Sequence, residues 1–223
     1  MDVEEFTADL TTRNRERMKE TVDQYYNEEY FGSLGDPEDV IANEFPYRGW
    51  REFFFGCLPA NRQISLITEQ GDPWHRDRDL VVGLFKQIRD EVKHARIYTN
   101  LAARFGAETD LATWTPDTYD ELVAQGNASM NWDAPHHISA AFQCGTEIQA
   151  AFMTENLADY LQDYYPDVAR SLRDIVADEG DHVHAGRLTM HRFASPDEFG
   201  RLEEISQTKY EAALASLVAH TEQ

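Results

Sequence analysis

The sequence is poor in lysine, in cysteine and in long apolar runs. Lysine occurs at only four of the 223 positions, and the 20 basic residues face 41 acidic ones, which gives a formal charge of −21. Nucleic-acid phosphates and anionic lipids both need a cationic surface, so the charge argues against either partner. We attribute the acidic excess to a halophilic host, whose salt-filled cytoplasm screens the repulsion.

Few cysteines and the absence of a long apolar run favour a cytoplasmic protein. Cys57 and Cys144 are the only cysteines, and the acidic N-terminus carries no secretory signal, so we expect reduced thiols. No apolar run approaches the roughly 20 residues of a membrane span. Hydrophobic residues make up 42% of the chain, enough for one globular domain over residues 1–223.

Strand signals are also scarce, whereas helix signals recur along the chain. Asp36-Pro37 and Ser195-Pro196, for example, pair an N-cap residue with proline in the first turn. We therefore predict an all-α fold, a four-helix bundle within about 37–193 plus one flanking helix at each terminus. The predicted bundle helices span about 37–70, 73–105, 135–163 and 166–193, and the flanking helices about 3–30 and 196–219.

The lengths of the connections predict how these helices are joined. Short loops make the first two and the last two bundle helices antiparallel hairpins. One long crossover, about 106–134, joins the hairpins and holds a short helix near 116–125. Pro59 lies inside the first bundle helix and is expected to kink or interrupt it.

One motif occurs in both hairpins: residues 90–94 read DEVKH and residues 178–182 read DEGDH. Positions i and i+3 of a helix share a face, so Glu91 lies beside His94 and Glu179 beside His182. Both pairs interrupt an apolar stripe that must face the core. Buried carboxylates need a cation or many hydrogen-bond donors, which predicts a shared metal site.

A two-metal site in such a bundle takes one further glutamate from each of the other two helices. Folding each hairpin about its loop places these partners near residues 51 and 150. Glu52 and Glu147 lie there. Glu44 is an alternative to Glu52, and Glu155 a weaker alternative to Glu147.

The order Glu, DExxH, Glu, DExxH on four helices resembles the ferritin-like di-iron carboxylate superfamily over about residues 40–193. The resemblance implies a ferritin-like bundle with two iron ions, or two manganese ions or a mixed Mn/Fe pair. Glu91 and Glu179 would bridge the metals. The implied ligands are, for one metal, Glu52, Glu91 and His94 and, for the other, Glu147, Glu179 and His182.

The resemblance also implies residues around the metals. In oxygen-activating members, the aspartate before each ExxH often bonds a metal-bound histidine, and Asp90 and Asp178 occupy these positions. Cys144, Ala151 and Tyr98 are candidates for the lining of a pocket beside the metals.

A shorter stretch is similar to the catalytic-subunit group of phenylacetyl-CoA epoxidases: GCLP after the first glutamate, then DEVKHARIYTNLAARFG. This implies a mono-oxygenase that uses O2 or peroxide, a small organic or acyl-CoA-like substrate and an electron-donor protein. Multicomponent hydroxylases often carry threonine four residues after the third-helix glutamate. Here that position is Ala151, so the exact mechanism does not transfer.

Other functions compatible with the motifs are a rubrerythrin-like peroxidase, a manganese catalase and a non-catalytic iron-binding ferritin-like protein. The four-cysteine motif of a rubredoxin iron site is absent, which argues against full-length rubrerythrin. Storage ferritins usually lack the second histidine, so His182 argues against storage. The two flanking helices offer a surface for a homodimer.

Overall fold

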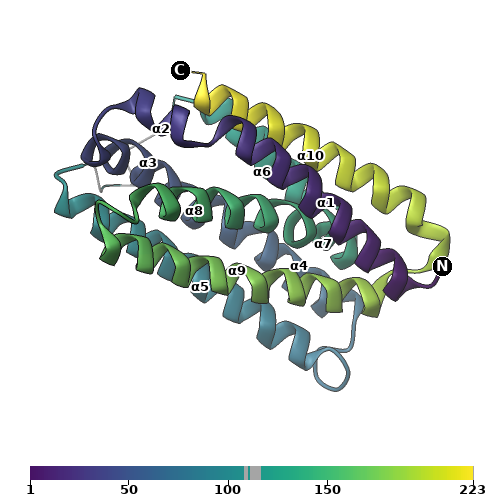
Figure 1. Ribbon diagram of the computed structural model, residues 1–223. Coiled ribbons are helices and arrows are strands. Elements are labelled where there is room, and N and C mark those ends of the chain that lie inside the picture. Colours follow the sequence, from purple (N-terminus) through teal and green to yellow (C-terminus); the bar gives the residue numbers. More distant parts are fainter. Residues whose placement is uncertain (108–109, 111–116, 223) are drawn as a thin grey trace.

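The computed structural model describes residues 1–107, 110 and 117–222, and every regular element in them is a helix. The all-α prediction is confirmed, as an all-helical bundle (Figure 1). No helix in the described ranges combines the length and apolar character needed to cross a membrane.

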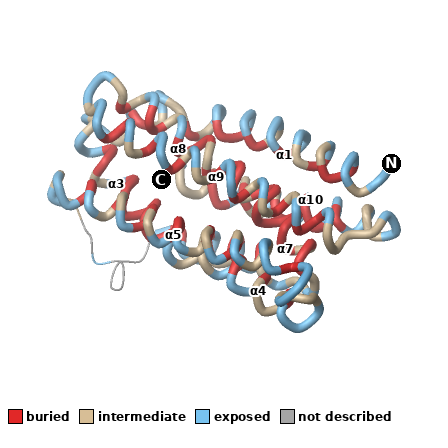
Figure 2. Tube along the Cα trace, turned by 90° about the horizontal axis from the view of Figure 1, so that it is seen from below, coloured by how far each residue is buried: buried red, intermediate tan, exposed pale blue. Residues whose placement is uncertain are grey.

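The bundle consists of two antiparallel hairpins. In the first, α3 (Pro37–Arg51), a π-helical segment η1 (Glu52–Gly56) and α4 (Cys57–Gln70) form one rod that packs against α5 (Arg78–Arg104). In the second, α7 (Pro135–Ala141), a π-helical segment η2 (Phe142–Thr146) and α8 (Glu147–Leu161) pack against α9 (Pro166–Phe193). Contacts between α5 and α9 join the hairpins, and buried positions face inward along the helices (Figure 2).

The second bundle helix begins later than the sequence predicts, at Arg78 and not at residue 73. Residues 72–77 form a turn in which the Asp72 amide donates to the Asp77 carboxylate at 2.6 Å. Asp77 also accepts from Arg192 of α9 at 2.6 Å. Because this buried carboxylate is held by both partners, the chain stays in the turn and the helix starts after it.

Pro59 does not break the first rod at its own position. It lies in the first turn of α4, where a missing amide costs little. The interruption occurs just before it, in η1. The third predicted helix is likewise interrupted by η2, whereas the fourth has the predicted limits.

The N-terminal flank is two helices and not one. The α1 helix (Val3–Tyr25) ends before Asn27, whose side chain accepts from the amides of Glu29 and Tyr30 and so starts α2 (Glu28–Leu34). In the crossover, α6 spans Tyr119–Met130, and the predicted start at 116 lies outside the described residues. A 3-10 turn η3 (Pro196–Glu198), closed by a capping box between Ser195 and Glu198, leads into α10 (Phe199–Thr221).

The flanking helices α1 and α10 run parallel across one face of the bundle (Figure 1). Their side-chain bonds keep a nearly constant offset: Arg13 to Glu203 and Arg17 to Gln207 are 190 positions apart, and Thr21 to Tyr210 is 189 positions apart. Such an offset is that of parallel helices in register. Both flanks also pack against the bundle, α1 against α8 and α9, and α10 against α7.

Glu44, the alternative ligand, lies in a polar network that ties these flanks to α3. Its fully buried carboxylate accepts hydrogen bonds from the hydroxyl groups of Tyr26 and, at 2.6 Å, of Tyr30. It also lies 3.0 Å from His220 Nε2. Burial opposes ionisation, but His220 and the two tyrosines outweigh it and lower the pKa of Glu44. Glu44 therefore stabilises the fold as a hydrogen-bonded carboxylate, away from the other predicted ligands.

We expect Tyr26→Phe to destabilise the protein by about 1.5–3 kcal/mol, because it removes a donor from a buried charged acceptor. Tyr25→Phe is the matched control, since Tyr25 contributes no hydrogen bond to Glu44. Equilibrium urea unfolding of both variants measures the difference. Equal stabilities would contradict the role given to this network.

Candidate metal centre

The predicted ligands converge in the middle of the bundle, and all of them are buried. They come from η1, α5, the first position of α8, and α9. The six side chains are Glu52, Glu91, His94, Glu147, Glu179 and His182. The hairpin geometry thus brings together residues up to 130 positions apart in the sequence, 182 − 52.

These side chains form two overlapping groups of four, and within each group one ligand atom per residue lies within 4.8 Å of the others. Glu91 and Glu179 belong to both groups, while Glu52 and His94 complete one and Glu147 and His182 the other. Two sites that share two carboxylates are the arrangement in which carboxylates bridge a pair of cations.

The first histidine points an imidazole nitrogen without a hydrogen-bond partner into its group. His94 Nδ1 lies 3.5 Å from Glu52 Oε2 and 3.6 Å from Glu179 Oε1. Both His94 Nδ1 and Glu179 Oε1 are buried without a hydrogen-bond partner in the described structure. Buried polar atoms are almost always paired, and a cation between these two would satisfy both. The residues therefore fit a metal.

The second histidine also faces its group through Nδ1, but here Nδ1 is hydrogen-bonded to Glu179 and Nε2 has no partner in the described structure. His182 Nδ1 lies 2.9 Å from Glu179 Oε2, 3.4 Å from Glu91 Oε1 and 3.8 Å from Glu147 Oε2. Each group thus offers one imidazole nitrogen and several carboxylate oxygens. Iron and manganese both accept this mixture.

The two aspartates of the DExxH motifs serve each other's histidine. Asp178 Oδ2 lies 3.1 Å from His94 Nε2, and Asp90 Oδ2 lies 3.7 Å from His182 Nε2. Lys93 bonds Asp178, and Lys86 bonds Asp90 at 2.8 Å. Burial raises the pKa of each aspartate, but these lysines and the neighbouring charges lower it overall. At His94 the carboxylate bonded to Nε2 keeps the proton there and leaves Nδ1 free for a metal. Asp90 lies on the same side of His182 but beyond hydrogen-bond distance.

Both π-helical segments lie at the site. Glu52 opens η1, and Glu147 directly follows η2. A π-helical turn inserts an extra residue into a helix and is frequent at functional sites. In η1 it brings Gly56 against α5, where an added Cβ would overlap the carboxylate of Glu91. Only glycine leaves room for that ligand.

Sequence reasoning missed the neutral and cationic side chains that hold the carboxylates. Gln87 Nε2 donates to Glu147 Oε1 at 2.7 Å, and Gln143 Nε2 donates to Gln87 Oε1 at 3.2 Å. Arg48 Nη2 lies 3.9 Å from Glu52 Oε1. The sequence does carry a signal for them: Arg48, Gln87 and Gln143 each precede a ligand glutamate by four positions, on the same helix face.

Burial and neighbouring charges shift the pKa of one carboxylate downward and the pKa values of two others upward. Burial disfavours the charged form of Glu52, but His94 and Arg48 outweigh it and lower its pKa to about 2. Burial raises the pKa of Glu91 and Glu147 well above the usual range, and the neighbouring carboxylates raise it further. For His182, burial is outweighed by Glu179, which raises the pKa to about 9. Protons therefore offset the charge of the metal-free site.

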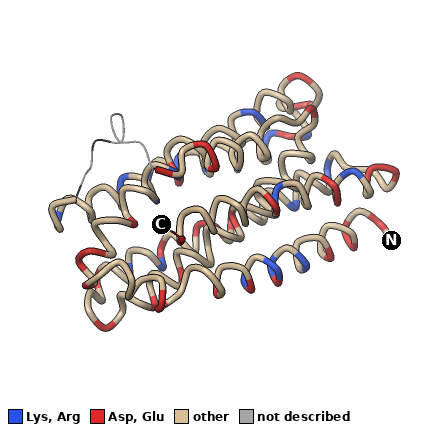
Figure 3. Tube along the Cα trace, turned by 90° about the horizontal axis from the view of Figure 1, so that it is seen from above, with Lys and Arg blue, Asp and Glu red and all other residues tan. Residues whose placement is uncertain are grey.

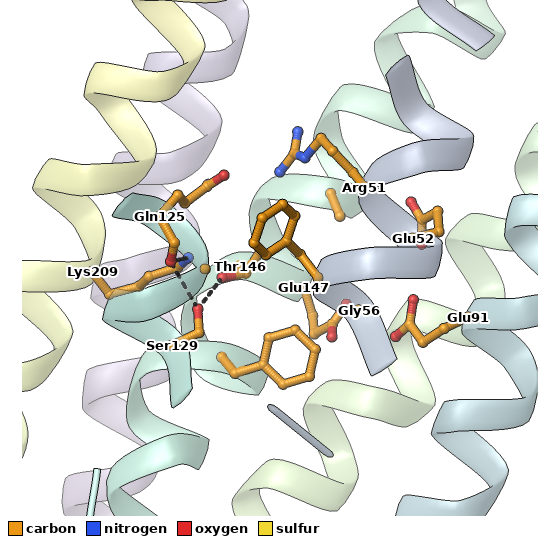
Figure 4. A pocket seen from close by; sticks show the side chains of 13 residues that line it. Arg51, Glu52, Gly56, Glu91, Gln125, Ser129, Thr146, Glu147 and Lys209 are labelled. Atoms are coloured by element: carbon orange, nitrogen blue, oxygen red, sulfur yellow. Dashed lines mark hydrogen bonds between the residues drawn. The ribbon is translucent and has the colours of Figure 1, made fainter. Parts of the chain in front are cut away.

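The pocket candidates have different positions. A cavity of about 30 Å³ touches Glu52, Glu91 and Glu147 and is lined on α8 by Ala150, not Ala151 (Figure 4). Ala151 instead lines a second hollow of about 360 Å³ beside α1 and α9, which also touches the predicted ligand Glu179.

Neither Cys144 nor Tyr98 lines the cavity. The Cys144 thiol faces away from it, toward the Thr11 hydroxyl at 3.7 Å, because η2 turns this side of the helix toward α1. The Tyr98 hydroxyl lies 3.1 Å from Thr154 Oγ1 and accepts from Arg48 at 3.4 Å. The two residues are thus not among those that line this cavity, and a pocket role for them stays a prediction.

No protein-family model matches the chain, and a search of curated proteins gave no match. What the site does must therefore be inferred from its own residues.

We expect metal affinity to rise steeply with pH. His182, Glu91 and Glu147 all have raised pKa values, so near neutral pH a cation must displace at least one proton. The association constant for Mn²⁺ should increase about tenfold or more per pH unit between pH 6 and 8. Titrations of the metal-free protein at pH 6, 7 and 8 measure it.

The same pKa shifts determine whether the metal-free protein becomes more or less stable as the pH rises. Groups whose pKa is raised by folding stabilise the folded protein at low pH, and this stability is lost as pH rises through the raised values. The melting temperature of the metal-free protein should therefore fall from pH 6 to 9, while the metal-loaded protein should not follow. A metal affinity independent of pH would contradict these protonation states.

We expect Gly56→Ala to lower metal content to one equivalent or less, because the new methyl group displaces the Glu91 carboxylate that both groups share. Gly83→Ala on α5 is the control, since nothing lies within 4 Å of the added Cβ. That variant should bind as wild type and be more stable by about 0.5–1 kcal/mol. Elemental analysis and urea unfolding measure both. Full metal content in Gly56→Ala would refute the close approach.

Proposed function

We propose that the protein is a di-iron carboxylate oxidoreductase that activates O2 or peroxide. The observation that carries the proposal is the pair of buried ligand groups that share Glu91 and Glu179. Overlapping groups support two cations held close together, the geometry that two-metal enzymes use.

Charge supports two divalent cations and not one. Four ionised carboxylates carry four negative charges, which two divalent cations cancel when both histidines are neutral. A single divalent cation would leave two buried negative charges, which the low polarity of the bundle interior disfavours. The aspartates on the Nε2 side of the two histidines would favour the tautomer whose Nδ1 faces the metals and would raise the basicity of that nitrogen.

Bound iron would supply electrons to O2 or peroxide. The protein's own residues would position the metals, exclude bulk water and control protons. Gln87 bonds Glu147 and lies 3.4 Å from Glu91, which limits how these two carboxylates shift. Arg48 anchors the helix turn of Glu52 through Thr154 and the Ala150 carbonyl.

We propose mono-oxygenation of a small organic or acyl-CoA-like compound as the specific reaction. It uses one O2, two electrons from an electron-donor protein and two protons, and it places one oxygen atom in the product and the other in water. The second candidate is peroxide turnover by iron or manganese, which the mixed carboxylate and imidazole ligands also support. A homodimer is compatible with either reaction.

Metal analysis tests the site itself. We expect two equivalents of iron in the wild type and less than one in Glu91→Ala and in Glu179→Ala, since each change removes a ligand from both groups. Glu155→Ala is the matched control on α8, because Glu155 is exposed and belongs to neither group. Retention of both metals without Glu91 would refute the shared site.

Oxygen uptake then separates the candidate functions. Anaerobic loading with Fe²⁺ followed by air should consume about one O2 per pair of irons, and none in Glu179→Ala. Two bound manganese ions with rapid peroxide consumption would favour a manganese catalase. Uptake of many irons per chain would favour storage. Absence of bound metal after reconstitution would refute the enzyme proposal.

A further inference from the structure

The cavity beside the metal ligands is closed by elements outside the bundle. The crossover helix α6 contributes Gln125, Gly126 and Ser129, and the C-terminal helix α10 contributes Lys209 (Figure 4). The opposite wall is formed by Glu52 and Arg51 of the first rod. The cavity therefore meets carboxylates at the candidate metal centre, with Arg51 on the same rod as Glu52 and Lys209 on the opposite wall.

Lys209 is one of only four lysines, and it is 1% exposed. Its ammonium group has three donors, yet it makes one hydrogen bond, to the Gln125 carbonyl at 2.8 Å. Among the described residues no carboxylate lies within ion-pair distance of it. Burial and then the nearby Arg51 lower its pKa well below the usual range, against the opposing effect of Glu147. The charged form of a lysine buried in this way is costly unless a negative charge joins it.

Arg51 presents a second buried cation to the same cavity. It is 8% exposed, and its Nη1 donates to the sulfur of Met153 at 3.4 Å, a weak acceptor. Its guanidinium lies 5.6 Å from the centre of the Tyr47 ring, and it forms no ion pair in the parts of the chain that the structure describes.

Two other cationic side chains near the core lie beside carboxylates. Arg48 lies 3.9 Å from Glu52, and Arg192 is paired with buried Asp77. In a chain with 41 acidic residues, carboxylate partners are abundant, and acidic positions are spread along the helices (Figure 3). None of those described neutralises the two cations of the cavity. The space between them suits an anion from outside.

We propose that this cavity binds the carboxylate group of a short organic acid, with Lys209 and Arg51 as its counter-charges. Such an acid is then the substrate class of the site, a statement that rests on the proposed function. The volume of about 30 Å³ is roughly twice the ~10–15 Å³ that one water needs, so it admits a carboxylate group and little more. Ser129 and Thr146 supply hydroxyl groups at its edge.

Calorimetric titration with formate and with acetate tests the proposal, at constant ionic strength set with potassium chloride. The titrations are run on protein whose metal content has been measured, and they are repeated after the metals have been removed. We expect Lys209→Met and Arg51→Gln each to raise the Kd for these anions at least tenfold. Lys19→Met is the control, because Lys19 is exposed and paired with Asp23, and it should change Kd less than twofold.

Thermal unfolding distinguishes binding from a structural role. Formate should raise the melting temperature of the wild type and not of Lys209→Met. Without formate, Lys209→Met should melt at the same temperature as the wild type or higher, because an unpaired buried charge has been removed. A lower melting temperature together with an unchanged Kd for formate would identify a structural lysine and overturn the proposal.

The remaining outcomes are also decisive. Absence of formate and acetate binding to the wild type overturns the proposal, as does binding that disappears with the metals but persists in Lys209→Met and Arg51→Gln. If Lys209→Met does not fold, Arg51→Gln makes the same test. Binding that depends on Lys209 in protein that takes up no metal would support the anion pocket and refute the proposed oxidoreductase.

Discussion

Four carboxylates and two imidazoles share one small volume in the middle of the bundle. Much of the surrounding structure lowers the free-energy cost of burying so many ionisable groups together. Without metal, raised pKa values keep protons on Glu91, Glu147 and His182. With metal, two divalent cations would replace those protons. The interior therefore needs compensating positive charge, and binding of metal at this site would be coupled to folding.

The arrangement has an approximate internal symmetry that follows from this constraint. Each hairpin supplies one glutamate beside a π-helical segment and one DExxH motif, and each aspartate serves the histidine of the other hairpin. The symmetry ends at the glutamines. Gln87 precedes Glu91 by four positions, whereas the equivalent position before Glu179 is Ile175, a buried apolar residue. The two groups thus have unequal hydrogen-bond support, and two bound metals would have different surroundings.

The sequence was enough to predict the helix order and the residues that meet, because both depend on regular geometry. Spacing of three places Glu and His on one face, and short loops fix the level at which hairpin partners face each other. The sequence did not decide whether Glu44 or Glu52 is the ligand from the first helix, since both lie on its core face. Eight positions separate them, about 12 Å along a helix. Only the packing of Tyr26 and His220 against Glu44 separates the two roles.

What the sequence did not predict depends on contacts between distant elements. The π-helical segments have no distinctive local composition, yet they orient Cys144 toward α1 and bring Gly56 against Glu91. Lys209 is a single lysine in a flanking helix, 27 positions after the last ligand, 209 − 182. The packing of α10 against α6 and α7 places it at the cavity beside the candidate metal centre. The flanks are therefore more than packing for the bundle: α10 supplies one of the two cations of the cavity. A truncated four-helix bundle would keep all six candidate ligands and lose that cation.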